Sequence, residues 1–223
     1  MFNDQYGLTQ AVLEGRKTMT RRICSTHIQQ CLNIAEKGVL LIPVQEIPHN
    51  MSIEEFADAF AKHTGVIELK DNSKCRHISP KKEEILEKVI AHSPYKLGEV
   101  VAVAQSYKQA YPKADFMMIG NNFMTESAGW NNKMFVRADL MPHLIRITNI
   151  KVERLQDITD EACLKEGIFQ SSWNRYYLYT FTHSKKNYHT TRDAFAAIID
   201  RISGKGTWES NPWAFAYDFE LVQ

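Results

Sequence analysis

The stretch Gly15-Arg16-Lys17-Thr18-Met19-Thr20-Arg21-Arg22 brings four cations and two hydroxyl groups into eight residues. It follows a short segment in which Leu8, Ala11 and Val12 fall on one helical face. Gly15 stands where helices commonly end through a left-handed residue. The octet is therefore expected to begin at the exit of a helix.

The backbone of this octet has two alternatives. In an extended strand, alternate side chains point to opposite sides, which separates Lys17 from Thr20; a tight turn instead brings the two together. The octet is suited to contact an anionic or polar group, and the alternative interpretation is an ordinary solvated face. The octet becomes a candidate for a functional site if residues from other parts of the chain lie next to it in the fold.

Length and composition indicate an ordinary globular protein. The 223 residues are 44% hydrophobic and 24% charged, which fits one domain, 1–223, with a substantial insertion. The net charge of +1, from 27 basic and 26 acidic residues, does not favour nonspecific binding to duplex nucleic acid or to an anionic membrane. No apolar segment resembles a signal peptide or a membrane span, so a cytoplasmic location is expected.

The cysteines are scattered without a CxxC pair and are interpreted as reduced, buried thiols. The alternative is a zinc site. Cys24, His27 and Cys31 would share one face of a helix, and Cys75 with His77 would complete the ligand set. Structural zinc usually has tighter, paired ligand spacing. Neither a metal nor another cofactor is therefore predicted.

Residues 24–93 differ in pattern from the rest and are interpreted as an insertion that is family-variable and helical. The pattern predicts a strand over 39–44 and a helix over 53–64, followed by a polar loop over 71–76. A second helix is predicted over 80–90, because a proline occupies its first position and apolar residues repeat along one stripe.

Three apolar segments predict strands. Residues 100–104 read as a strand buried on both sides, and 215–221 as a closing strand with one buried face. The alternation within 144–152 changes phase between Ile147 and Ile150, which predicts a bulge or a sharp barrel corner.

The last third contains two helix patterns and one mixed segment. Thr159 is predicted to cap a short helix that stops at Gly167, which puts Glu166 at its C-terminal end. A carboxylate there meets the negative end of the helix dipole, so Glu166 should need a cation nearby, such as a lysine, or else be a tuned acid or base. The second predicted helix spans 191–203 and has one apolar stripe, formed by Phe195, Ile198, Ile199 and Ile202. Residues 173–189 interleave aromatics with cations, as in a base-stacking surface or a surface hairpin.

Five stretches, in this order, resemble the ASCH domain family, and most closely its phage and prophage branch. They are 14–22 (EGRKTMTRR), 95–103 (YKLGEVVAV), 141–147 (MPHLIRI), 152–159 (VERLQDIT) with 166–168 (EGI), and 208–213 (WESNPW). The resemblance covers both ends of the chain and leaves out 24–93, together with much of 108–135 and 170–190. It implies an α+β fold of the PUA-like type, in which helices flank a small β-barrel.

The resemblance also implies a function. Related domains bind RNA or modified bases, and a small bacterial member is an amidohydrolase that removes the acetyl group of N4-acetylcytidine with a lysine, a threonine and a glutamate. Its motif places these residues at Lys17, Thr20 and Glu166. Where the phage branch usually carries Arg-Glu, this chain has Ala104-Gln105, which leaves binding without turnover as an alternative.

The expected site is a cleft that binds a nucleobase, either in a free nucleoside or in single-stranded RNA. Beside the three catalytic candidates, the expected contact residues are Arg16, Arg21, Arg22, Gln105, Tyr107, Arg146 and Trp213. Two other functions remain open. The chain would be a non-catalytic RNA-binding module if 175–188 were the contact surface, or a phage-encoded protein that binds a host protein through the insertion.

Overall fold

The computed structural model describes residues 2–37, 40–43, 64–68, 74–78, 82–114, 117–171 and 178–222. The helices are α1 (Leu8–Leu13), α2 (Thr26–Lys37), α4 (Lys82–Ala91), α5 (Tyr107–Ala110), α6 (Asp160–Lys165), α7 (Thr191–Ser203) and α8 (Thr207–Ser210). The strands are β1 (Met19–Ile23), β2 (Leu40–Pro43), β3 (Thr64–Glu68), β4 (Lys74–Ile78), β5 (Val100–Ala102), β6 (Met118–Ile119), β7 (Asn122–Phe123), β8 (Leu144–Arg154), β9 (Phe169–Ser171), β10 (Leu178–Thr180) and β11 (Trp213–Leu221). Short 3-10 helices are η1 (Asp4–Tyr6), η3 (Met124–Glu126), η4 (Lys133–Phe135), η5 (Ala138–Leu140) and η6 (Leu155–Asp157).

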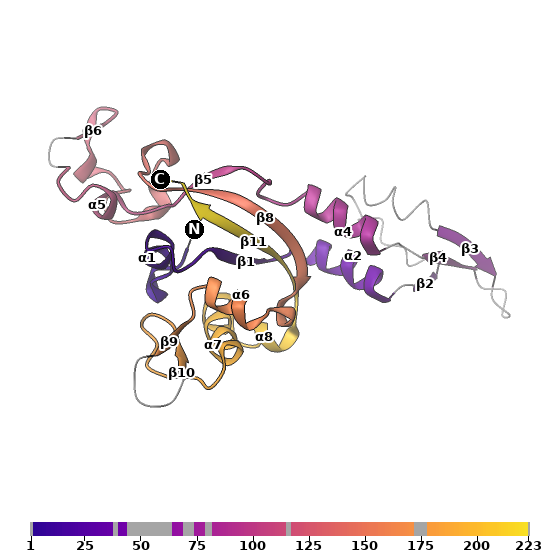
Figure 1. Cartoon of the computed structure of the whole chain (residues 1–223). Helices are drawn as coiled ribbons and strands as arrows, with labels where there is room; N and C mark the ends of the chain where they lie inside the picture. The colour runs from indigo at the N-terminus through magenta and orange to yellow at the C-terminus, as the bar shows by residue number, and fades with distance from the viewer. Residues whose placement is uncertain are drawn as a thin grey trace.

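A four-stranded antiparallel sheet in the order β1-β11-β8-β5 forms the centre of this mixed α+β fold. The sheet curls like part of a barrel, with α6, α7 and α8 gathered at one side (Figure 1). Along β8, Ile147 pairs with Phe219 and Asn149 pairs with Asp218, so Thr148 is an extra residue in the ladder. The change of phase in the sequence therefore marks a real β-bulge, which increases the local bend of the strand.

The core lies between the sheet and the helices. Strand β11 contributes most to it: Ala214, Phe215, Ala216 and Tyr217 are all buried, so both of its faces are covered. The prediction of one buried face for this strand was wrong, because its central position in the ladder encloses the small alanines as well. At the sheet edge the opposite holds, since Val100 of β5 is 48% exposed although 100–104 was predicted to be buried on both sides.

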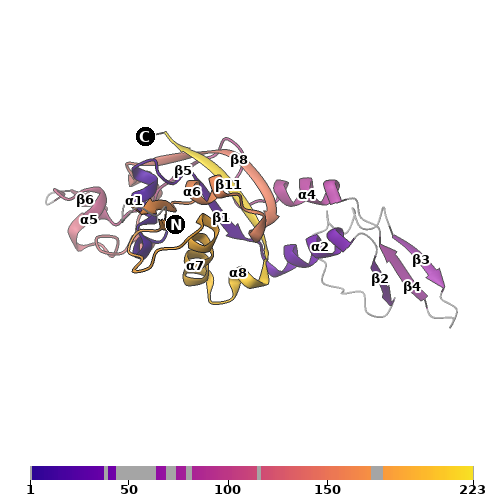
Figure 2. The same cartoon turned by 60° about the horizontal axis from the view of Figure 1, so that its bottom comes forward.

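Helices α2 and α4 leave the body side by side and lead to a distal sheet of order β2-β4-β3 (Figures 1 and 2). The strand predicted over 39–44 is confirmed by β2, and the helix predicted over 80–90 is confirmed by α4. Residues 74–76, predicted as loop, belong to β4, and the insertion is thus only partly helical. The predicted helix over 53–64 lies almost entirely outside the described residues.

A second cluster of side chains lies beyond β5, where residues 107–141 form short helices and the β6–β7 hairpin. Strands β9 and β10 form another antiparallel pair next to α7, which agrees with a hairpin in the aromatic and basic segment. Residues 172–177, including the rest of that segment's aromatic stretch, lie outside the described residues.

Helix α6 positions Glu166, which lies at the C-terminal end of this helix. The Thr159 hydroxyl accepts a hydrogen bond from the Ala162 N–H, and Gly167 follows with a φ of +99°. Both the N-terminal cap and the glycine stop were predicted from the sequence and are confirmed. Glu166 is the C-terminal cap residue of the helix.

Replacing Thr159 with alanine should lower the free energy of unfolding by about 1 kcal/mol, because the Ala162 N–H loses its cap. Urea denaturation of the whole chain measures this. Thr159→Ser keeps the hydroxyl and should remain close to the unsubstituted protein. An equal loss in both variants would show that the cap is not the cause.

Candidate functional site

Two remote segments of chain meet at the end of α6. The chain leaves α1 through Gly15, which has a φ of +71°, and the Lys17 N–H then donates to Ala11 O over 2.9 Å. One residue later the Thr18 N–H donates to Lys165 O, also over 2.9 Å. These backbone bonds hold the start of the cationic octet against the C-terminal turn of α6.

The carboxylate of Glu166 is bound by two cations. Lys17 Nζ lies 2.6 Å from Glu166 Oε2 and also donates to the Glu166 carbonyl over 2.9 Å. Arg21 Nη1 lies 3.1 Å from Glu166 Oε1. The side chains of Lys17, Arg21 and Glu166 are 2%, 3% and 7% exposed. The prediction that Glu166 needs a nearby cation is confirmed, and a lysine supplies one of the two.

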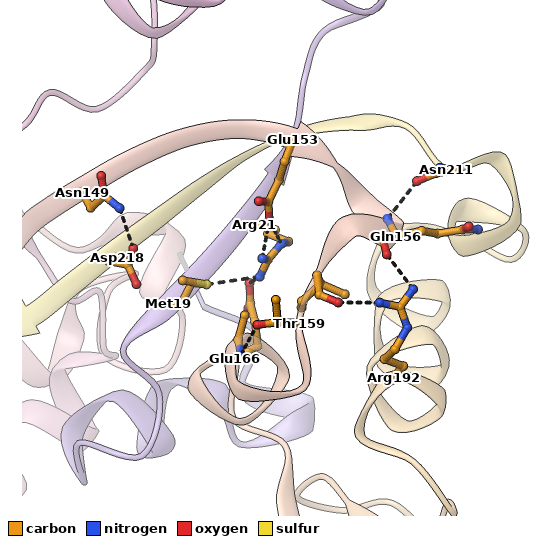
Figure 3. Close-up of polar contacts among 12 residues, drawn as sticks. Met19, Arg21, Asn149, Glu153, Gln156, Thr159, Glu166, Arg192, Asn211 and Asp218 are labelled. Atoms are coloured by element: carbon orange, nitrogen blue, oxygen red, sulfur yellow. Dashed lines mark hydrogen bonds and ion pairs between the residues drawn. The ribbon is translucent and has the colours of Figure 1, made fainter.

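Arg21 extends this network to the sheet. Its guanidinium reaches Glu153 of β8 through Nε, at 3.1 Å, and Nη2, at 2.5 Å, while Nη1 also contacts Met19 Sδ (Figure 3). Figure 3 shows Arg21 lying between Glu153 and Glu166. Two carboxylates therefore balance the charges of Lys17 and Arg21, which burial would otherwise make costly.

The buried amine of Lys17 is easier to deprotonate than an ordinary lysine. Burial lowers its pKa, because the ammonium loses its hydration, and the positive charges of Arg22 and Arg21 lower it further. The carboxylate of Glu166 opposes this shift by stabilising the ammonium. A lysine whose pKa is lowered in this way is suited to act as a base.

Lys17, Thr20 and Glu166 line one cavity of about 190 Å³, which we call the Lys17 cavity. Thr20 lies on β1, so the octet is extended from Met19 onward, whereas Lys17 precedes the strand. The expectation that an extended backbone separates the two residues was wrong, because both line this cavity. Within the described part of the chain, the Thr20 hydroxyl makes no hydrogen bond to another residue. The remaining lining residues are Phe2, Asn3, Leu8, Arg21, Arg22, Ile23, Phe195, Ile198, Ile199, Ile202 and Ser203.

A small chamber of about 50 Å³ lies next to the Lys17 cavity, on the concave side of the sheet. Phe2, Thr20 and Arg22 line both spaces, so Thr20 stands between them. The rest of the chamber is mostly apolar and includes Ala104.

Two predicted contact residues face away from the cavity. Arg16 is exposed at the exit of α1 and pairs with Glu14 over 2.5 Å. Arg146 lies on β8 and pairs with Glu220 of the adjacent strand over 3.0 Å, with both side chains about half exposed. Neither arginine lines the Lys17 cavity or the small chamber.

Three further predicted residues are buried elsewhere. Gln105 accepts a hydrogen bond from His143 Nδ1 over 2.7 Å, and Tyr107 packs in the second cluster beyond β5. Trp213 lies at the start of β11, where its indole N–H donates to Asn33 Oδ1 over 3.0 Å. The structure therefore groups Arg21 and Arg22 with the three catalytic candidates and separates the other five contact residues from them.

Sequence reasoning missed two parts of this site. Glu153 was part of a quoted motif, but nothing in its neighbourhood indicated that it would bind Arg21. The apolar wall comes from α7, where Phe195, Ile198 and Ile202 were interpreted only as a core stripe. Ile202 is 39% exposed, and an apolar stripe in the sequence does not show which of its members will line a cavity.

Of the five candidate zinc ligands, only the side chain of Cys24 is described. No group of three His, Cys, Asp or Glu side chains among those residues is placed to hold a metal ion. The side chains of His27, Cys31, Cys75 and His77 lie outside the described set. Cys24 is buried, and burial raises the pKa of its thiol to about 12. It is thus an inert packing residue at neutral pH.

Comparison with models of protein families, with curated proteins and with solved structures gave no match to this chain. Among the described residues, no helix has the length and apolar character needed to cross a membrane.

Arg21→Met should lower the free energy of unfolding by about 3 kcal/mol, because it leaves buried Glu166 and half-buried Glu153 without their shared cation. Arg146→Met is the matched control: it breaks an arginine–glutamate pair of the same sheet in solvent, and should cost less than about 1 kcal/mol. Chemical denaturation of both variants provides the comparison. Similar losses of unfolding free energy in the two variants would show that burial of the network does not increase its contribution to stability.

Proposed function

We propose that this chain is an ASCH-type protein of the PUA-like superfamily, and that its Lys17 cavity binds a cytidine-type nucleobase and hydrolyses an acyl amide on its exocyclic nitrogen. The observation that carries the proposal is the single cavity shared by Lys17, Thr20 and Glu166. Lys17 and Glu166, two of the residues at which the resemblance places catalytic groups, are 149 residues apart in sequence and in direct contact.

The features of the cavity suit the two parts of such a substrate. The α7 wall, formed by Phe195, Ile198 and Ile202, offers an apolar surface against which a planar base can pack. The small chamber on the other side of Thr20 has room for a short acyl group and little more. Thr20 would thus face the bond between acyl group and base.

The chemistry follows from the charges of the site. Neutral Lys17 takes the proton of the Thr20 hydroxyl, and the oxygen attacks the acyl carbon. The ammonium then returns the proton to the leaving nitrogen as the amide bond breaks. Water cleaves the resulting ester by the same base, which releases the carboxylic acid and restores the threonine. The net reaction is amide plus water giving amine plus acid.

Glu166 and Arg22 have supporting roles in this scheme. Because Glu166 accepts hydrogen bonds from Lys17 and Arg21, we assign to it the positioning of the lysine. Arg22 lines both spaces beside Thr20, so we assign to it the stabilisation of the oxyanion.

Release of acetate and cytidine from N4-acetylcytidine tests the proposal. Thr20→Ala should reduce the rate by at least ~10²-fold, since the nucleophile is removed. Its hydroxyl makes no hydrogen bond to described residues, so folding should be unaffected. Thr18→Ala, two residues earlier and outside the cavity lining, is the matched control and should retain activity. Absence of turnover, or equal turnover in Thr20→Ala, would refute the enzymatic proposal.

The pH dependence of hydrolysis tests the role of Lys17. The lysine acts as a base only when neutral, so kcat/KM should rise with pH, with a midpoint below the ordinary lysine value of 10.5 because burial lowers the pKa. Glu166→Gln removes the carboxylate that raises this pKa, and should therefore move the midpoint to still lower pH. A midpoint that stays fixed in this variant would exclude Lys17 as the titrating base.

A further inference from the structure

A second, open cavity of about 540 Å³ lies on the surface between η1, the turn after β10 and the end of α7. We call it the basic groove. Its lining residues are Gln5, Tyr6, His183, Lys185, Lys186 and Arg201. Among the described residues, no aspartate or glutamate lines it, although the chain as a whole carries nearly equal numbers of acids and bases.

The cations of the basic groove are not neutralised by neighbours. Within the described residues, Lys185, Lys186 and Arg201 form no ion pair. Two acids stand next to groove residues in the sequence, and both are engaged elsewhere. Asp4, before Gln5, pairs with Lys133 over 2.8 Å, and Asp200, before Arg201, accepts from the backbone N–H groups of Gly206 and Trp208. The groove therefore keeps an uncompensated positive charge.

The turn that carries the lysines is fixed before any ligand arrives. The carbonyl of Lys186 accepts hydrogen bonds from the hydroxyls of Thr180 and Ser184, at 3.0 and 2.8 Å. His183 adopts a φ of +60°, and its Nδ1 is hydrogen-bonded to the carbonyl of Gln5 over 3.0 Å. A turn held in this way presents its cations without a large loss of backbone entropy on binding.

The basic groove and the Lys17 cavity are neighbours. Near the N-terminus, Asn3 lines the cavity and Gln5 lines the groove. On α7, Ile202 lines the cavity, whereas Arg201, the residue before it, lines the groove. The two spaces thus occupy adjacent faces of one helix, and a helix is only about 10 Å across with its side chains.

We propose that the basic groove binds phosphate groups of the molecule whose base enters the Lys17 cavity, so that the substrate is a nucleotide rather than a free nucleoside. This inference rests on the proposed function. Three uncompensated cations beside a cavity suited to a base are what a phosphate on the ribose of that nucleotide would require. The phosphate belongs either to a free nucleotide or to a single-stranded RNA, and these two sources share the same chemistry.

Ligand binding to the full chain distinguishes a free nucleotide from a single-stranded RNA. The Thr20→Ala variant is used, because it prevents turnover of the ligand. The ligands are N4-acetylcytidine, its monophosphates and a trinucleotide that contains it, measured by calorimetry at low and high salt. A phosphate-bearing ligand should bind about tenfold more tightly than the nucleoside at low salt. Lys186→Ala combined with Arg201→Ala should remove this gain and leave nucleoside affinity unchanged. Lys205→Ala, an exposed lysine just beyond α7, is the matched control.

Each outcome decides the inference. A gain seen with the monophosphates identifies a free nucleotide, and a gain that appears only with the trinucleotide identifies an RNA strand. Equal affinities for the nucleoside and every phosphate-bearing ligand would overturn the inference, as would an equal effect of Lys205→Ala. If the nucleoside does not bind but the trinucleotide does so through Lys186 and Arg201, the proposed nucleobase site fails while the groove stands.

Discussion

The carboxylate of Glu166, held between Lys17 and Arg21, is the interaction on which this structure depends. A buried charge without a partner costs several kcal/mol, so the segment after α1, strand β1 and the end of α6 must meet at one point. Glu153 completes the balance from β8. The same contacts that hold these elements together leave the Lys17 amine buried and poorly hydrated, so stability and reactivity come from one arrangement.

Local features of the fold were predictable from the sequence because they are encoded locally. The apolar stripe of α7, the Thr159 cap and the glycine stop at Gly167 each depend on residues within one or two turns. The bulge at Thr148 was predictable for the same reason, because the alternation of apolar and polar residues along a strand indicates which of its faces is buried. Even the need of Glu166 for a cation followed from its place at a helix end.

Which cation would meet Glu166 was not predictable in full. Lys17 was expected only through the family resemblance, and Arg21, separated from Glu166 by 145 residues, was expected to contact substrate. Gln105 and Trp213 were expected at the cleft and are buried elsewhere. The order of the motifs predicts where strands and helices occur in the sequence, but packing between these elements decides where each side chain points. Strand β4 was missed because its polar residues lack the apolar alternation that marks a half-buried strand.

The α2–α4 projection joins the body beside β11, and Leu32, Ile85 and Val89 of its two helices are buried in the main core. Cys24 N–H donates to Trp213 O over 3.0 Å where the chain departs, and the Ser93 and Tyr217 hydroxyls share a hydrogen bond of 2.6 Å where it returns. With both anchors set, the entropy of closing the intervening chain grows only with the logarithm of its length. Added length beyond the far ends of α2 and α4 should therefore cost the body little, whereas loss of either helix would open the core that Leu32, Ile85 and Val89 complete.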